Sequence, residues 1–177
     1  MRLALATVLA VAAGVLVGAV VVGGLGVALG YALFADDEPE TGLPASVLET
    51  HAALLEAAES GDYEELRPLV PASGFTYTFG EPAEDGPIAY WQRLETTRPA
   101  IEILAEILRM PYTLSRGYYV WPFAYDVASA EDLSAHEREL LEPLGPLDTL
   151  FAPGTGYLGW RAGIAPDGTW TFFVAGD

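Results

Sequence analysis

The sequence predicts an α+β fold in which helices pack on one face of a curved, cone-like antiparallel sheet, preceded by one N-terminal transmembrane helix. Three observations predict it: helical periodicity in the first half, aromatic β-prone runs from residue 118 onward, and a closing hairpin over residues 157–176. In that hairpin, residues 165–169 combine proline, aspartate and glycine, which favour a turn. Strand alternation assigns one face to Leu158, Trp160, Ala162, Ile164, Trp170, Phe172 and Val174. A lone hairpin is unstable in water, so helices must cover this face.

Residues 3–34 carry no charged side chain and are long enough to cross a bilayer, which takes about 20 apolar residues as a helix. We therefore expect a membrane anchor over residues 1–35, with membrane lipid as its first partner. Arg2 precedes the run and acidic residues follow it, so the positive-inside rule places the N-terminus in the cytoplasm and the domain outside the cell membrane. The alternative is a signal peptide cleaved near residues 28–30, which releases a secreted protein.

Two pairs of glycines in this run have the four-residue spacing that lets transmembrane helices approach closely. They are Gly14 with Gly18 and Gly26 with Gly30. The spacing predicts a protein partner or self-association through the membrane helix.

The composition excludes several classes of function. The chain has no cysteine, so thiolate metal sites and disulfides are absent. Seven arginines stand against 25 acids after Ala35, a formal charge of −18, and such a surface repels nucleic acid. Two isolated histidines make no typical zinc site, and no glycine-rich phosphate loop or activated serine motif is present in the domain. We therefore expect no cofactor, no metal and no evident catalytic set.

We interpret residues 36–45 as an acidic tether and residues 46–177 as the α+β domain. A capping box at residues 46–49 predicts a helix that ends at Gly61, and a second signature at residues 62–65 predicts a short helix. Residues 75–79 alternate aromatic side chains with threonine, as a half-buried strand does.

The second half alternates in the same way between helix and strand signals. Helical spacing recurs over residues 88–94 and 99–108, and residues 118–123 predict a strand. A third capping box begins at Ser134 and predicts a helix to Leu141, followed by a loop over residues 143–156.

The segment LLEAAESGDYEEL, residues 54–66, resembles the opening of the nuclear transport factor 2-like (polyketide-cyclase-like) superfamily, in which a helix breaks at Gly-Asp before a second short helix. The closing residues 166–177 resemble the end of bacterial membrane-anchored proteins without an assigned activity. Curvature of the predicted sheet would leave a pocket between sheet and helices. The resemblance implies a wide choice of activity, from isomerases and dehydratases to non-catalytic binding and assembly modules.

Six residues are candidates for a pocket. His51 falls on the apolar face of its helix, where it is either a proton carrier or a core histidine satisfied by one hydrogen bond. Asp126 follows an aromatic strand and Arg161 points away from Trp160, so the two are expected to meet near a sheet surface. The tyrosines expected to join them are Tyr77, Tyr118 and Tyr125.

Three functions remain open at this level. The first is a membrane-anchored extracytoplasmic binding or assembly module. The second is a pocket enzyme of the isomerase or dehydratase type that uses Asp126 or His51. The third is an accessory subunit of a larger membrane complex, docked through the glycine-lined helix.

Overall fold

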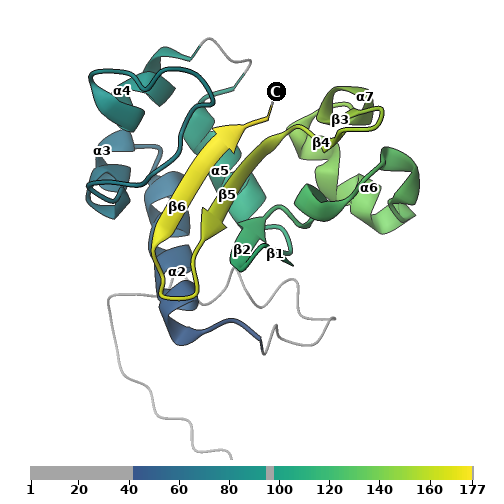
Figure 1. Cartoon of the computed structure of the whole chain (residues 1–177), viewed down its shortest axis with the longest axis horizontal. Helices are drawn as coiled ribbons and strands as arrows, with labels where there is room; N and C mark the ends of the chain where they lie inside the picture. The colour runs from purple at the N-terminus through teal and green to yellow at the C-terminus, as the bar shows by residue number, and fades with distance from the viewer. Residues whose placement is uncertain (1–41, 95–97, 177) are drawn as a thin grey trace, which may run out of the picture. The chain divides into compact units, whose positions relative to one another are not determined.

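A computed structural model describes residues 42–94 and 98–176 of the chain (Figure 1). The predicted anchor, most of the predicted tether and the glycines Gly14, Gly18, Gly26 and Gly30 lie outside the described residues. Within the part that is described, no helix combines the length and the apolar character needed to cross a bilayer.

The first described helix, α2 (Ala45–Ser60), ends as predicted at Gly61, whose φ of 73° lies in the left-handed region that favours glycine. Its start differs from the prediction, because Pro44 is the N-cap and the capping box at residues 46–49 does not form. The Ser46 hydroxyl instead donates to the carbonyl oxygen of Pro166 at 2.8 Å. A tertiary contact with the closing hairpin has replaced the local cap.

Three more helices follow α2, and all three confirm helices that the sequence predicts. Asp62 caps α3 (Tyr63–Leu66) by accepting from the Glu64 backbone N–H, and the 3₁₀ helix η2 (Arg67–Leu69) continues it. The next two are α4 (Gly86–Arg93) and α5 (Ala100–Leu108).

Four antiparallel strands form the main sheet in the order β1-β2-β5-β6. Their bounds are β1 (Thr113–Ser115), β2 (Tyr118–Trp121), β5 (Trp160–Ile164) and β6 (Trp170–Ala175). The strand predicted over residues 75–79 is reduced to one parallel bridge between Thr76 and Phe172 at the β6 edge. The hairpin of β5 and β6 is the one that the sequence predicts.

The face predicted for β6 was partly wrong. A register shift between Gly163 and Ile164 pairs Ile164 with Trp170 and Ala162 with Phe173. The extra residue on β6 turns Phe172 and Val174 to the opposite face from Trp170. Phe173, rather than Phe172, therefore joins the core.

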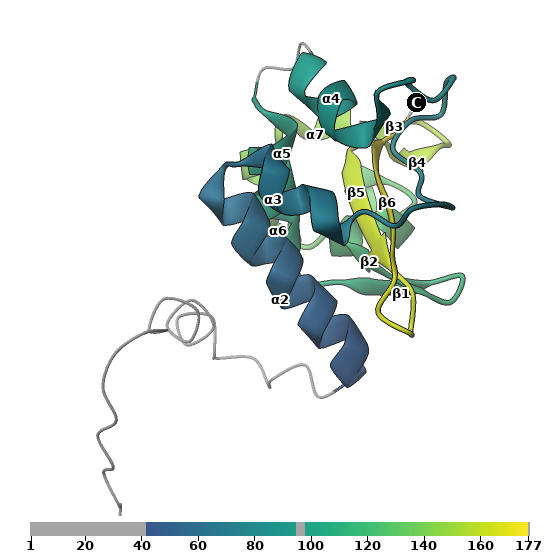
Figure 2. The ribbon, with the colours of Figure 1, turned by 90° about the vertical axis from the view of Figure 1, so that its left-hand side faces the viewer.

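One face of the sheet packs against α2 and α5, as Figure 2 shows. The largest side chains buried there are Trp91, Trp121, Trp170 and Phe173. Trp91 and Phe173 have ring centroids 5.2 Å apart in an edge-to-face arrangement. The aromatic runs of the sequence thus fill the space between sheet and helices.

Between β2 and β5 the chain builds a second, smaller cluster. Its elements are η3 (Phe123–Asp126), η4 (Ala130–Asp132), α6 (Ala135–Leu141), η5 (Glu142–Leu144), α7 (Leu147–Leu150), β3 (Phe151–Ala152) and β4 (Gly156–Tyr157). The capping box at Ser134 is confirmed, whereas the loop predicted over residues 143–156 contains short helices and a two-stranded ladder. Leu141, Leu150 and Phe151 are the buried centre of this cluster.

The turn of the closing hairpin makes a testable contact with α2. A Cβ at Gly168 would lie 2.8 Å from the backbone oxygen of Ser46, whereas a Cβ at Gly74 would meet nothing within 4 Å. Both glycines have positive φ, 89° and 77°. We expect Gly74→Ala to cost about 1 kcal/mol of unfolding free energy from backbone strain alone.

Gly168→Ala should cost clearly more, about 2 kcal/mol or above, because the turn must also move away from α2. Urea unfolding of the two variants measures the difference. Equal losses would show that the approach of the turn to α2 does not constrain the fold.

Candidate functional site

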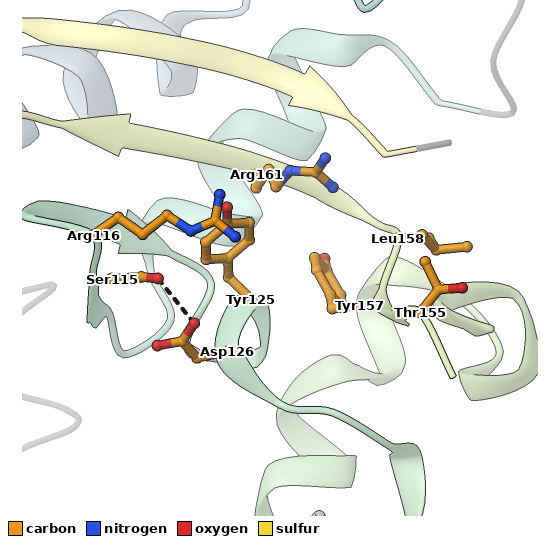
Figure 3. A pocket seen from close by; sticks show the side chains of 8 residues that line it. All are labelled: Ser115, Arg116, Tyr125, Asp126, Thr155, Tyr157, Leu158 and Arg161. Atoms are coloured by element: carbon orange, nitrogen blue, oxygen red, sulfur yellow. Dashed lines mark hydrogen bonds between the residues drawn. The ribbon is translucent and has the colours of Figure 1, made fainter. Parts of the chain in front are cut away.

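A pocket of about 270 Å³ opens where η3, the β1–β2 turn and the segment after β4 meet β5 (Figure 3). Its lining is mostly polar and includes two guanidinium groups, one carboxylate and several hydroxyls. The lining residues are Ser115, Arg116, Tyr125, Asp126, Thr155, Tyr157, Leu158 and Arg161.

The pocket lies on the face of the sheet that α2 and α5 leave uncovered. Trp160, Ala162 and Ile164 of β5 belong to the core that packs against these helices. Arg161 alternates with them and so projects from the other face. The pocket expected between sheet and helices was therefore misplaced, because aromatic side chains fill that space.

Arg116 and Gly117 form the two-residue loop between β1 and β2. Both have positive φ, 52° and 87°, the signs of a type I′ turn. Such loops favour asparagine, aspartate or glycine, because a side chain with a Cβ costs about 1–2 kcal/mol in the left-handed region. Arg116 therefore occupies a locally unfavourable position at the rim of the pocket.

The carboxylate of Asp126 is held from β1. Its Oδ1 accepts a hydrogen bond from the Ser115 hydroxyl at 2.9 Å, drawn as a dashed line in Figure 3. Ser115 is 8% exposed, so the partner is fixed in the protein while Asp126 itself stays accessible. Among the described residues no second donor reaches this carboxylate.

Arg161 stacks against two aromatic rings. Its guanidinium carbon lies 5.2 Å from the ring centroid of Phe79 and 5.6 Å from that of Tyr125. Attraction between a cation and the ring faces limits where this guanidinium can lie. The group also donates to the Gly159 carbonyl at 3.4 Å.

Tyr157 forms part of the wall. It is 5% exposed, and its hydroxyl donates to the Trp160 carbonyl oxygen at 3.0 Å. Burial raises the pKa of the phenol well above its usual value, although neighbouring Arg161 acts in the opposite direction. The phenol is therefore neutral at physiological pH. A Cβ at Gly159 would lie 2.3 Å from its hydroxyl oxygen, so glycine is needed where the ring crosses the chain.

Arginines elsewhere in the described part have structural partners. Arg67 pairs with Glu64, Arg93 with Asp85, Arg98 with Glu102 and Glu106, and Arg109 with Glu59 and Glu106. Arg138 donates to the carbonyl oxygens of Leu133 and Glu131. Arg116 has no such hydrogen bond or ion pair with any described residue. Its guanidinium is therefore available at the pocket.

The structure brings together three of the six predicted candidates, Tyr125, Asp126 and Arg161. Tyr118 is on the same face of the sheet and packs edge-on against Phe172, but it does not line the pocket. Tyr77 is a core residue, 8% exposed, whose hydroxyl donates to the Ala83 carbonyl.

His51 lies on the helix-covered side, 6% exposed, with its ring 4.7 Å from that of Trp121. Its Nε2 is 2.8 Å from the Leu108 carbonyl oxygen. Because a carbonyl can only accept, Nε2 carries the proton. This geometry is that of the core histidine satisfied by one hydrogen bond.

Sequence reasoning missed the other lining residues, Ser115, Arg116, Thr155, Tyr157 and Leu158. A signal existed for the first two, because Arg116-Gly117 separates two β-prone runs by two residues, as in a tight hairpin. The segment 155–158 gave no such signal.

Within residues 42–94 and 98–176, no three histidine or acidic side chains come together as a metal site would require. Comparison of the chain with protein-family models, curated proteins and solved structures finds no match.

The buried imidazole of His51 predicts a dependence of stability on pH. Burial lowers the pKa of His51, outweighing the opposite effect of its hydrogen bond to Leu108. As pH falls below about 6.5, the unfolded chain takes up the proton before the folded one, so the unfolding free energy decreases.

We expect His51→Gln to flatten the decline in unfolding free energy between pH 7 and 5, measured by urea titration at each pH. His136→Gln, at an exposed histidine, should leave the slope unchanged. Carboxylates whose pKa is lowered, among them Asp167 and Glu137, stop contributing to the unfolding free energy only near and below about pH 4.5, which is outside this range. An unchanged slope in His51→Gln would contradict the assignment.

Proposed function

We propose that this chain is a membrane-anchored, extracytoplasmic binding module that holds a small organic anion in the pocket between Arg116 and Arg161. The observation that carries the proposal is the placement of two guanidinium groups at one pocket of a chain with net charge −17. Guanidinium groups bind carboxylates through paired, charge-assisted hydrogen bonds.

The strained turn supports the same reading. An arginine in a left-handed position, with no ion pair to a described residue, contributes nothing evident to folding. Residues held in sparsely populated backbone conformations occur preferentially at functional sites. We therefore assign Arg116 to ligand binding rather than to stability.

The geometry favours binding over catalysis. An isomerase or dehydratase of the expected type needs its acid or base at the floor of an enclosed apolar cavity. Here Asp126 is exposed at a polar pocket, and His51 lies on the other side of the sheet. Neither alternative, Asp126 or His51, therefore has the setting that such an enzyme needs.

The proposal also includes a membrane anchor and membership of a protein superfamily. The uncharged residues 3–34 support a single membrane helix with the domain outside the cell. Membership of the nuclear transport factor 2-like superfamily is supported by the helix break at Gly61-Asp62 and by an antiparallel sheet that packs against helices.

Replacement of Arg116 should change binding and stability in opposite directions. Arg116→Asn removes the guanidinium and places a residue that tolerates the left-handed conformation in the turn. We expect affinity to fall about 10- to 100-fold, since charge-assisted hydrogen bonds contribute about 1.5–3 kcal/mol. The unfolding free energy should rise by up to about 1 kcal/mol.

Calorimetric titration of the full chain in detergent with succinate, L-aspartate and inorganic phosphate measures the first effect, and urea unfolding measures the second. Arg67→Gln is the control, because Arg67 is exposed and pairs only with Glu64. Absence of binding by all three anions, or equal binding by Arg116→Asn, would overturn the proposed function.

Reporter fusions test the proposed topology. A phosphatase that is active only outside the cytoplasm, fused after Ala35 or after Asp177, should be active in both positions because both follow the predicted span. The matched fusion ahead of residue 3 should be inactive. Activity of a cytoplasmic reporter at both downstream positions would refute the orientation.

A further inference from the structure

We infer that the ligand of this pocket is an acidic α-amino acid, a compact molecule with two carboxylates and one ammonium group. The inference rests on the proposed function, because it names the ligand class of the same pocket. The inference is supported by the charges that line the pocket, which are two guanidinium groups and one carboxylate. The two carboxylates and the ammonium group of such a ligand have the complementary charges.

The carboxylate of Asp126 is the group that a simple anion leaves unexplained. A pocket for a dianion gains nothing from a fixed negative charge, which would repel the ligand. Yet Asp126 is held at the pocket by the buried Ser115, and its remaining acceptor positions receive no hydrogen bond from any described residue. An ammonium group supplies both an opposite charge and three donors to fill them.

The two arginines suit two separate carboxylates. Arg116 approaches from the β1–β2 turn, whereas Arg161 approaches from β5 (Figure 3) and lies over the rings of Phe79 and Tyr125. Each guanidinium has five donors, and Arg161 directs one of them to the Gly159 carbonyl. The hydroxyls of Tyr125 and Thr155 add neutral partners at the same pocket.

The size and lining of the pocket select a short, polar molecule. Its volume of about 270 Å³ lies just below the range of about 300–1,000 Å³ that holds drug-sized ligands. Leu158 alone offers an aliphatic side chain. A ligand with four or five carbons and three charged groups fits these limits better than an aromatic or lipid-like acid.

The inference is tested by calorimetric titration of the full chain in detergent with L-aspartate, L-malate and succinate, which differ only in the group on one carbon. We expect L-aspartate to bind about tenfold more tightly than succinate, with L-malate between them. In Asp126→Asn this preference should disappear, because L-aspartate binds more weakly while succinate binds as well or better.

The control is Glu56→Gln, which also removes one negative charge, at an exposed position of α2 on the far side of the sheet. This variant should still prefer L-aspartate to succinate. Equal binding of L-aspartate and succinate by the unmodified chain, with both weakened by Arg116→Asn, would overturn this inference and leave the proposed anion site standing. A preference that survives in Asp126→Asn would also overturn it. No binding of any of the three would overturn the proposed function itself.

Discussion

Burial of one face of the β1-β2-β5-β6 sheet against α2 and α5 is the constraint on which the rest of this domain depends. Trp121, Trp170 and Phe173 are each no more than 1% exposed, and Trp91 from α4 packs among them. Side chains alternate along a strand. Because Ala162 and Ile164 face the core, Arg161 projects from the opposite face of the sheet. The packing of the core thus determines from which face of the sheet the charged residue of β5 projects.

The second cluster turns that exposed face into a pocket. After β2 the chain folds back through η3, where the Phe123 backbone N–H donates to the Pro111 carbonyl at 2.7 Å. This return places Tyr125 and Asp126 beside β1 and β5. On the opposite wall, the Leu158 backbone N–H donates to the Leu150 carbonyl oxygen and holds Leu158 in place. The insert between β2 and β5 therefore supplies five of the eight residues that line the pocket, and four of these five are polar.

Sequence alone predicted most of the elements and part of the site. The helices, the closing hairpin and the meeting of Asp126 with Arg161 follow from periodicity and strand alternation, which are local signals. Two of the errors have a cause in long-range contacts. An extra residue on β6, opposite Gly163 and Ile164, turned Phe172 outward, and the Ser46 hydroxyl donates to the Pro166 carbonyl instead of capping its own helix. Tyr77 was expected at the pocket, but it follows Thr76, which bridges to Phe172 of β6, and its side chain is buried in the core.

The acidic surface also bears on what the pocket can hold. With a net charge of −17, the chain repels every anion that approaches, and a dianion more than a molecule of net charge −1. The five described arginines away from the pocket contact carboxylates or carbonyls, so they weaken this field only locally. A ligand that brings its own ammonium group to Asp126 lowers the repulsion and gains a short-range attraction at the same time. The field of the whole domain and the charges of the pocket therefore favour the same class of ligand.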